Sequence, residues 1–123
     1  MQSNQTYVYA NSTLDERFGQ SERRRAEAVN DLLRLLATLT DLRAQSKQAH
    51  WNVRGSLFRE LHKLFDDAAA SADAFIDRVA ERAAALDGYV RGSLQETVAA
   101  TVLQEYPKGA HAWRDMDHVR SFV

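Results

Sequence analysis

Apolar side chains recur every three or four residues over most of this chain, which is the period of a helix with one apolar face. The first such stretch contains neither Gly nor Pro from Ser21, a candidate N-cap, to Asn52. The pattern predicts one long amphipathic helix over residues 21–52. Its apolar positions are Val29, Leu32, Leu33, Leu36, Leu39 and Leu42.

A second long helix is predicted directly afterwards. Residues 52–56 break the first period at Gly55, and a new helical period runs from Leu57 to Leu86 before Gly88, which is expected to end it. Two long helices joined by a short link predict an antiparallel hairpin.

The remaining elements are shorter. Ser93 and Glu96 form a capping box, which predicts a short helix that continues through Val98, Val102 and Leu103 until Tyr106 and Pro107 stop it. A fourth helical period begins at Ala110 and carries Trp113, Met116, Val119, Phe122 and Val123. Residues 1–20 lack an apolar period and are predicted to be a flexible arm, which leaves residues 21–123 as one all-α domain.

Composition narrows the class of protein. The chain has 123 residues, of which 45% are apolar and 27% charged, enough for one core and too few for two domains. The absence of cysteine excludes disulfide frameworks, thiolate catalysis and sulfur-ligated zinc. No apolar run is long enough to span a membrane, and the polar start is unlike a signal peptide. We expect a soluble cytoplasmic protein, and the net charge of −1 indicates no partner.

Candidate chemistry lies on one face of the second helix. At about 100° per residue, an arc of about 100° holds one imidazole and four carboxylates, with Lys63 at its far edge. Like charges stacked one turn apart are destabilising, so a bound cation would offset them. The alternative is an ordinary solvated face, which is the commoner meaning of a short motif of this kind. The residues in the arc are His62, Asp66, Asp73, Asp77 and Glu81.

Distance decides how such a site could be built. The rise of a helix separates His62 from Asp77 by about 22 Å, too far for one ion to touch both within one chain. Two copies of the helix, antiparallel about a two-fold axis, would bring His62 and Asp66 of one chain beside Asp77 and Glu81 of the other. Oxygen and imidazole ligands without sulfur suit Fe(II), Mn(II) or Zn(II).

Three segments together resemble the Dps family of mini-ferritins, the DNA-protection proteins of starved bacteria. They are KQAHWNVRG at 47–55, LFRELHKLFDD at 57–67 and FIDRVAERAAALDG at 75–88, with a weaker likeness in DHV at 117–119. The resemblance implies an intersubunit di-iron ferroxidase site, with Trp51 beside it and Lys47 close by. Its implied ligands are His50, His62 and Asp66 of one subunit with Asp77 and Glu81 of the two-fold mate.

The resemblance also implies an activity. Members of the family bind Fe(II), oxidise it preferentially with hydrogen peroxide, and store ferric oxide-hydroxide in a shell of twelve subunits, which protects DNA and allows association with the nucleoid. Many bind DNA through a Lys-rich arm. Residues 1–20 contain Arg17 as the one basic residue, against Asp15 and Glu16, so DNA binding by this arm is not expected.

The family's subunit is a four-helix bundle with a short helix between its second and third long helices. This chain ends a few turns into the third long helix, so we expect a ferritin-like bundle that is incomplete at its C-terminus. The alternative function is a non-enzymatic, truncated helical module that pairs with full-length Dps-like subunits. A metal-like spacing in HAWRDMDH, with His111, Asp115 and His118, matches nothing in the family's pattern and is expected to be surface.

Overall fold

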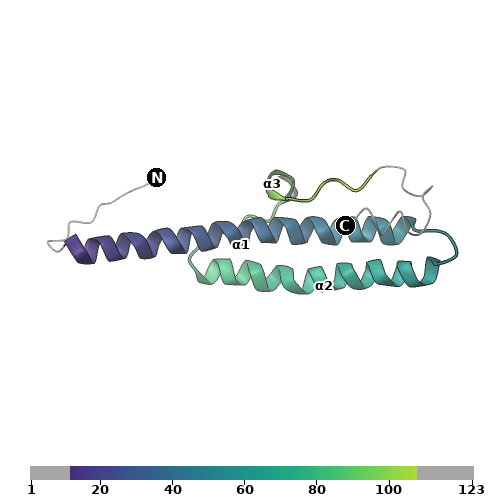
Figure 1. Ribbon diagram of the computed structural model, residues 1–123, viewed down its shortest axis with the longest axis horizontal. Helices are drawn as coiled ribbons and strands as arrows, with labels where there is room; N and C mark the ends of the chain where they lie inside the picture. The colour runs from purple at the N-terminus through teal and green to yellow at the C-terminus, as the bar shows by residue number, and fades with distance from the viewer. Residues whose placement is uncertain (1–11, 108–123) are drawn as a thin grey trace.

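A computed structural model describes residues 12–107 of the chain, with side chains described for residues 21–107. This part contains three helices. They are α1 (Ser12–Asn52), α2 (Phe58–Ala85) and α3 (Leu94–Ala100). α1 and α2 run antiparallel, side by side, and α3 lies on the other side of α1 (Figure 1). The predicted all-α hairpin is confirmed. The fourth helical period and the motif at 111–118 lie outside the described residues.

The start of α1 differs from the prediction. The helix begins at Ser12, so Ser21 is an exposed residue within it and not its N-cap, and residues 12–20 are helical. The missing apolar period did not prevent these nine residues, about two and a half turns, from being helical. Extending a helix that already exists adds one hydrogen bond per residue without a new nucleation cost, so ordinary helix formers suffice. Of the predicted arm, residues 12–20 are helical, and residues 1–11 lie outside the described region.

Two residues, Asp87 and Gly88, end α2, whereas the sequence predicted that Gly88 alone would end it. Asp87 takes the left-handed conformation, with φ of 64°, and its N–H donates to the Ala84 carbonyl. The Gly88 N–H donates to Ala83, which completes a Schellman motif. Gly88 is required for space and not for its φ, because a Cβ there would lie 2.6 Å from a methyl of Val29.

α3 begins as predicted and ends early. The Ser93 hydroxyl accepts from the Glu96 N–H, which confirms the cap. The helix stops at Ala100, and Thr101 turns into extended conformation while its hydroxyl donates to Asp41 of α1 at 2.7 Å. This long-range hydrogen bond fixes the chain direction where the sequence alone would have continued the helix.

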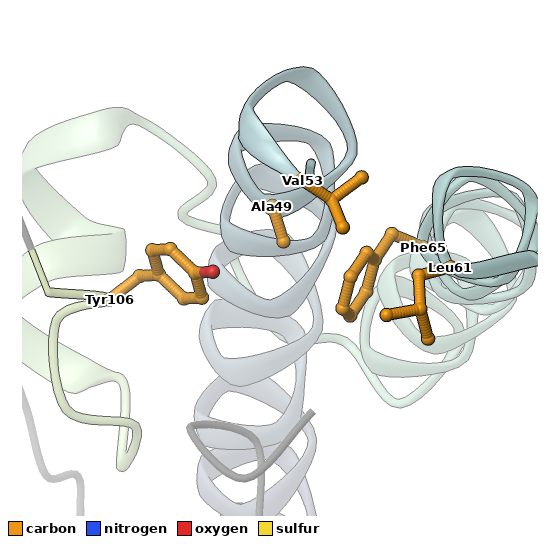
Figure 2. Packing of buried hydrophobic residues seen from close by; sticks show 5 residues of the cluster. All are labelled: Ala49, Val53, Leu61, Phe65 and Tyr106. Atoms are coloured by element: carbon orange, nitrogen blue, oxygen red, sulfur yellow. The ribbon is translucent and has the colours of Figure 1, made fainter. Parts of the chain in front are cut away.

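The core that positions the site lies at the end of the hairpin where α1 is linked to α2. Figure 2 shows Leu61 and Phe65 of α2 directed at Ala49 and Val53, with Tyr106 on the other side of α1. Tyr106, expected only as a stop signal, is 2% exposed and anchors the segment after α3. Within residues 12–107, none of the helices combines the length and apolarity that crossing a bilayer requires.

Candidate metal centre

The predicted ligands on the hairpin end each follow a buried residue. His50, His62 and Asp66 come directly after Ala49, Leu61 and Phe65, which belong to the core. One step along a helix turns a side chain by about 100°, so the residue after a core position lies at the rim of the core. All three are half-buried there. Packing of the hairpin end therefore sets where these polar groups emerge.

His50 and His62 hold each other in place through a ring stack and two hydrogen bonds. Their rings are stacked with centroids 3.6 Å apart and planes at 20°. Nδ1 of His50 lies 2.6 Å from the carbonyl oxygen of His62, and Nδ1 of His62 lies 2.8 Å from the carbonyl oxygen of His50. A carbonyl oxygen can only accept, so both Nδ1 atoms carry the proton. In the neutral rings both Nε2 atoms are then left with a free lone pair, the state in which imidazole binds a metal.

Asp66 is held as a carboxylate by a lysine of the other helix. Nζ of Lys47 donates to its Oδ1 at 2.6 Å. This hydrogen bond is the largest cause that lowers the pKa of Asp66 below its ordinary value of 3.8. Burial opposes it as the next largest effect, and the positive charge of Lys47 adds to the lowering. The side chain is therefore ionised and available as an oxygen donor throughout the neutral range.

Asp77 and Glu81 lie apart from the other candidates. Both are exposed on α2, and Asp77 is eleven residues beyond Asp66, a rise of about 16 Å. Among the side chains of residues 21–107 of one chain, no three from His, Asp or Glu are close enough together to hold one ion. The structure thus gathers His50, His62 and Lys47–Asp66 at one end of the hairpin and leaves Asp77 and Glu81 along the same helix.

The sequence suggested that the carboxylates of the arc have no cationic partners. In the structure, two of them pair with cations from the other long helix. α1 supplies Lys47 to Asp66 and Arg43 to Asp73, the latter at 3.1 Å. Asp77 and Glu81 belong to none of the ion pairs found among residues 21–107. The unbalanced charge of the arc is therefore concentrated on these two residues.

Two aromatic residues lie next to the histidines. Trp51, next to His50, is 71% exposed. Phe58 stacks on His62, with centroids 4.8 Å apart and planes at 26°, and sequence reasoning missed it. The four-residue spacing between Phe58 and His62 on one helix was the available signal, since such pairs lie on the same face.

Comparisons with known proteins agree with the fold. The pattern of the ferritin-like domain family matches residues 29–119. The DNA protection during starvation protein of Agrobacterium fabrum is 36% identical over 88 residues, which cover 72% of this chain and 53% of that protein. The DNA protection during starvation protein 2 of Deinococcus radiodurans is 40% identical over 83 residues, 68% of this chain and 34% of that one.

Solved structures give the same result. Dps92 of Deinococcus radiodurans superposes with a TM-score of 0.74 at 36% identity, covering 80% of this chain and 58% of that one. Dps of Staphylococcus aureus gives 0.73 at 27% identity, over 78% and 62%. This chain spans about half the length of the Agrobacterium relative and less than two thirds of these solved chains. The matched domain, the fold and the sequence identity together assign the chain to the ferritin-like family and, within it, to the Dps proteins.

Proposed function

We propose that this chain is a ferroxidase and iron-storage subunit that oxidises Fe(II) with hydrogen peroxide. The observation that carries the proposal is the reciprocal pairing of His50 and His62, in which each Nδ1 faces the other residue's backbone carbonyl and each Nε2 is left for a metal. The carboxylate of Asp66 lies at the same end of the hairpin. In the proposed site these three residues of one subunit bind iron together with Asp77 and Glu81 of the two-fold mate.

The donor set fits iron as the substrate. Imidazole nitrogens suit Fe(II), and hard carboxylate oxygens stabilise Fe(III), so the set favours oxidation of the bound ion. Two Fe(II) ions each give one electron to one molecule of peroxide, which takes up two protons and leaves as water. Pairing the electrons in this way avoids release of hydroxyl radical. The chain's own part is to hold the ions close together and to keep the ligands in their binding forms.

Neighbouring residues have supporting roles in the proposal. Lys47 keeps Asp66 ionised and in place through its 2.6 Å hydrogen bond. Trp51 lies beside His50 with 71% of its surface exposed, where its indole can take up stray oxidising equivalents. Removal of Fe(II) and peroxide together would protect DNA without direct DNA binding, and a larger shell of subunits would store the ferric product.

The first experiment is an anaerobic Fe(II) titration of the purified protein followed by a pulse of peroxide, recorded as ferric absorbance. The parent should bind Fe(II) saturably and oxidise it rapidly, and Asp77→Ala should abolish peroxide-dependent oxidation without loss of helicity. Asp67→Ala is the matched control. It also removes one aspartate carboxylate from α2, but at a residue that pairs with Lys63 and is not a predicted ligand. Oxidation by Asp77→Ala at the parent's rate would overturn the assignment of the site.

One observation favours a second function. Leu35, Leu64 and Phe75 are 45 to 50% exposed, so apolar surface on both long helices is uncovered in the described part of the chain. A non-enzymatic module that pairs with full-length Dps-like subunits would cover such surface. Co-purification with a longer homologue, together with no iron oxidation by the isolated chain, would favour this module over the ferroxidase.

A further inference from the structure

Phe58 is an aromatic residue at the site that the core does not account for. It is the first residue of α2, it is 42% exposed, and it is outside the buried cluster at this end of the hairpin. A phenyl ring left partly in water gains only part of the free energy that burial offers. Its ring stacks on the face of the His62 imidazole, with centroids 4.8 Å apart.

His62 is consequently enclosed on both faces. The His50 ring lies 3.6 Å from it and the Phe58 ring 4.8 Å, and both are nearly parallel to it. Two rings at these distances on the same face would overlap, so they occupy opposite faces. The edge of the imidazole is fixed separately, by the hydrogen bond from Nδ1 to the His50 carbonyl at 2.8 Å.

The hydrogen bond alone does not fix the ring. The torsion that turns an imidazole about its Cβ–Cγ bond has broad minima, and a ring held at one atom can rock about that atom. Contacts on both faces remove this freedom. We propose that Phe58 is a positioning residue that, by stacking on His62, holds the imidazole with Nε2 presented to the metal.

Phe58 acts through His62 and does not touch the ion. The metal-binding half of this inference rests on the proposed function, whereas the ordering of His62 can be observed without any metal. Aromatic pairs of this geometry are favourable beyond their buried area, and the pair is built within α2 because the two residues are one turn apart. Leucine at position 58 would fill similar space without a flat face.

The test compares Phe58→Leu with Phe75→Leu. Phe75 is the matched control: it lies on the same helix, is 50% exposed, and its ring faces the Arg78 guanidinium at 5.3 Å. Nitrogen-15 NMR of the metal-free protein should show one tautomer of His62 in the parent and in Phe75→Leu. Phe58→Leu should show mixed tautomers, and Phe58→Tyr should restore the single one.

Anaerobic titration with Co(II), followed by its visible absorption, supplies the second measurement. Affinity should fall on the order of 10-fold in Phe58→Leu, the lower end of what loss of a ligand's supporting contact costs, and should stay at the parent's value in Phe58→Tyr and Phe75→Leu. Circular dichroism checks that each variant is helical, and Phe58→Met replaces Phe58→Leu if the latter does not fold.

The outcomes separate the two proposals. A single His62 tautomer and unchanged Co(II) affinity in Phe58→Leu would overturn the positioning role, and so would equal effects in Phe75→Leu. Mixed tautomers in Phe58→Leu together with no Co(II) binding by the parent would support the ordering of His62 by Phe58 and count against the proposed function.

Discussion

At the scale of the residue, the site depends on contacts between side chains that are distant in the sequence. Lys47 and Asp66 are nineteen positions apart and meet at 2.6 Å because α1 and α2 are antiparallel. Their side chains are 41% and 50% exposed, so water screens the pair and its contribution to stability is small. Its effect on the protonation of Asp66 is the more useful observable.

Lys47→Met should raise the pKa of Asp66 toward its ordinary value, because the hydrogen bond from Lys47 is the largest cause that lowers it. Carboxyl carbon-13 NMR over a pH titration measures this directly. Lys63→Met is the control, since Lys63 donates to Asp67 instead. An unchanged titration of Asp66 in Lys47→Met would show that the ion pair is not formed in solution.

Lys47→Met also tests how the unfolding free energy depends on pH. A carboxyl group whose pKa is lowered on folding stabilises the protein above its unfolded pKa of about 3.9. That stability is lost as the pH falls through the lower folded value. The difference in unfolding free energy between parent and Lys47→Met should therefore be constant from pH 5 to 8 and disappear in stronger acid.

At the scale of the element, the register of the hairpin depends on one close approach. Gly88 follows α2 and lies against Val29 of α1, where a Cβ would meet a methyl carbon at 2.6 Å and the Ala83 carbonyl oxygen at 2.9 Å. Near it, Nη1 of Arg25 donates to the Leu86 carbonyl at 2.8 Å. Steric fit and a cap from the opposite helix together fix the end of α2 against α1.

Gly88→Ala should destabilise the protein by about 1–3 kcal/mol, the usual cost of overpacking a closed contact. Gly92→Ala is the control, because no atom lies within 4 Å of a Cβ built there. Its effect should stay within about 0.5 kcal/mol, as for most surface substitutions. Urea unfolding followed by circular dichroism measures both, and equal midpoints would mean that Val29 moves aside without cost.

At the scale of the whole molecule, the candidate ligands divide into two groups that one chain does not bring together. His62 and Asp77 are on the same straight helix, about 22 Å apart by its rise. A symmetric pair of antiparallel helices places each group opposite the other and repeats the arrangement twice. The proposed ferroxidase site is therefore a property of a dimer.

Mixing two inactive chains tests this directly. His62→Ala and Asp77→Ala should each lose oxidation when alone, whereas the heterodimer contains one site with both groups intact. After unfolding and refolding an equal mixture, half of the dimers should be mixed and half of their sites complete, so about one quarter of the parent's activity should return. No recovery, with mixed dimers demonstrated by mass spectrometry, would mean that the site is not shared in this way.

Particular elements show how far the sequence could predict the fold. Periodicity gave α2 to within one residue at each end, and the capping box gave the start of α3, because both depend on contacts within a few residues. The start of α1 and the end of α3 were wrong. α1 continues from an existing helix without needing an apolar face, and α3 ends where Thr101 bonds to Asp41, sixty residues away.

The candidate site divides in the same way. Residue type and spacing on the sequence predicted which groups could bind a metal and, from the length of one helix, that a second copy would be needed. Tertiary structure alone decided the tautomers of His50 and His62, the cations that α1 supplies to Asp66 and Asp73, and the stacking of Phe58. The reason is physical: helical period and chemical type are local properties of the chain, whereas a proton's position and an ion pair depend on which atoms the folded hairpin brings within hydrogen-bonding distance.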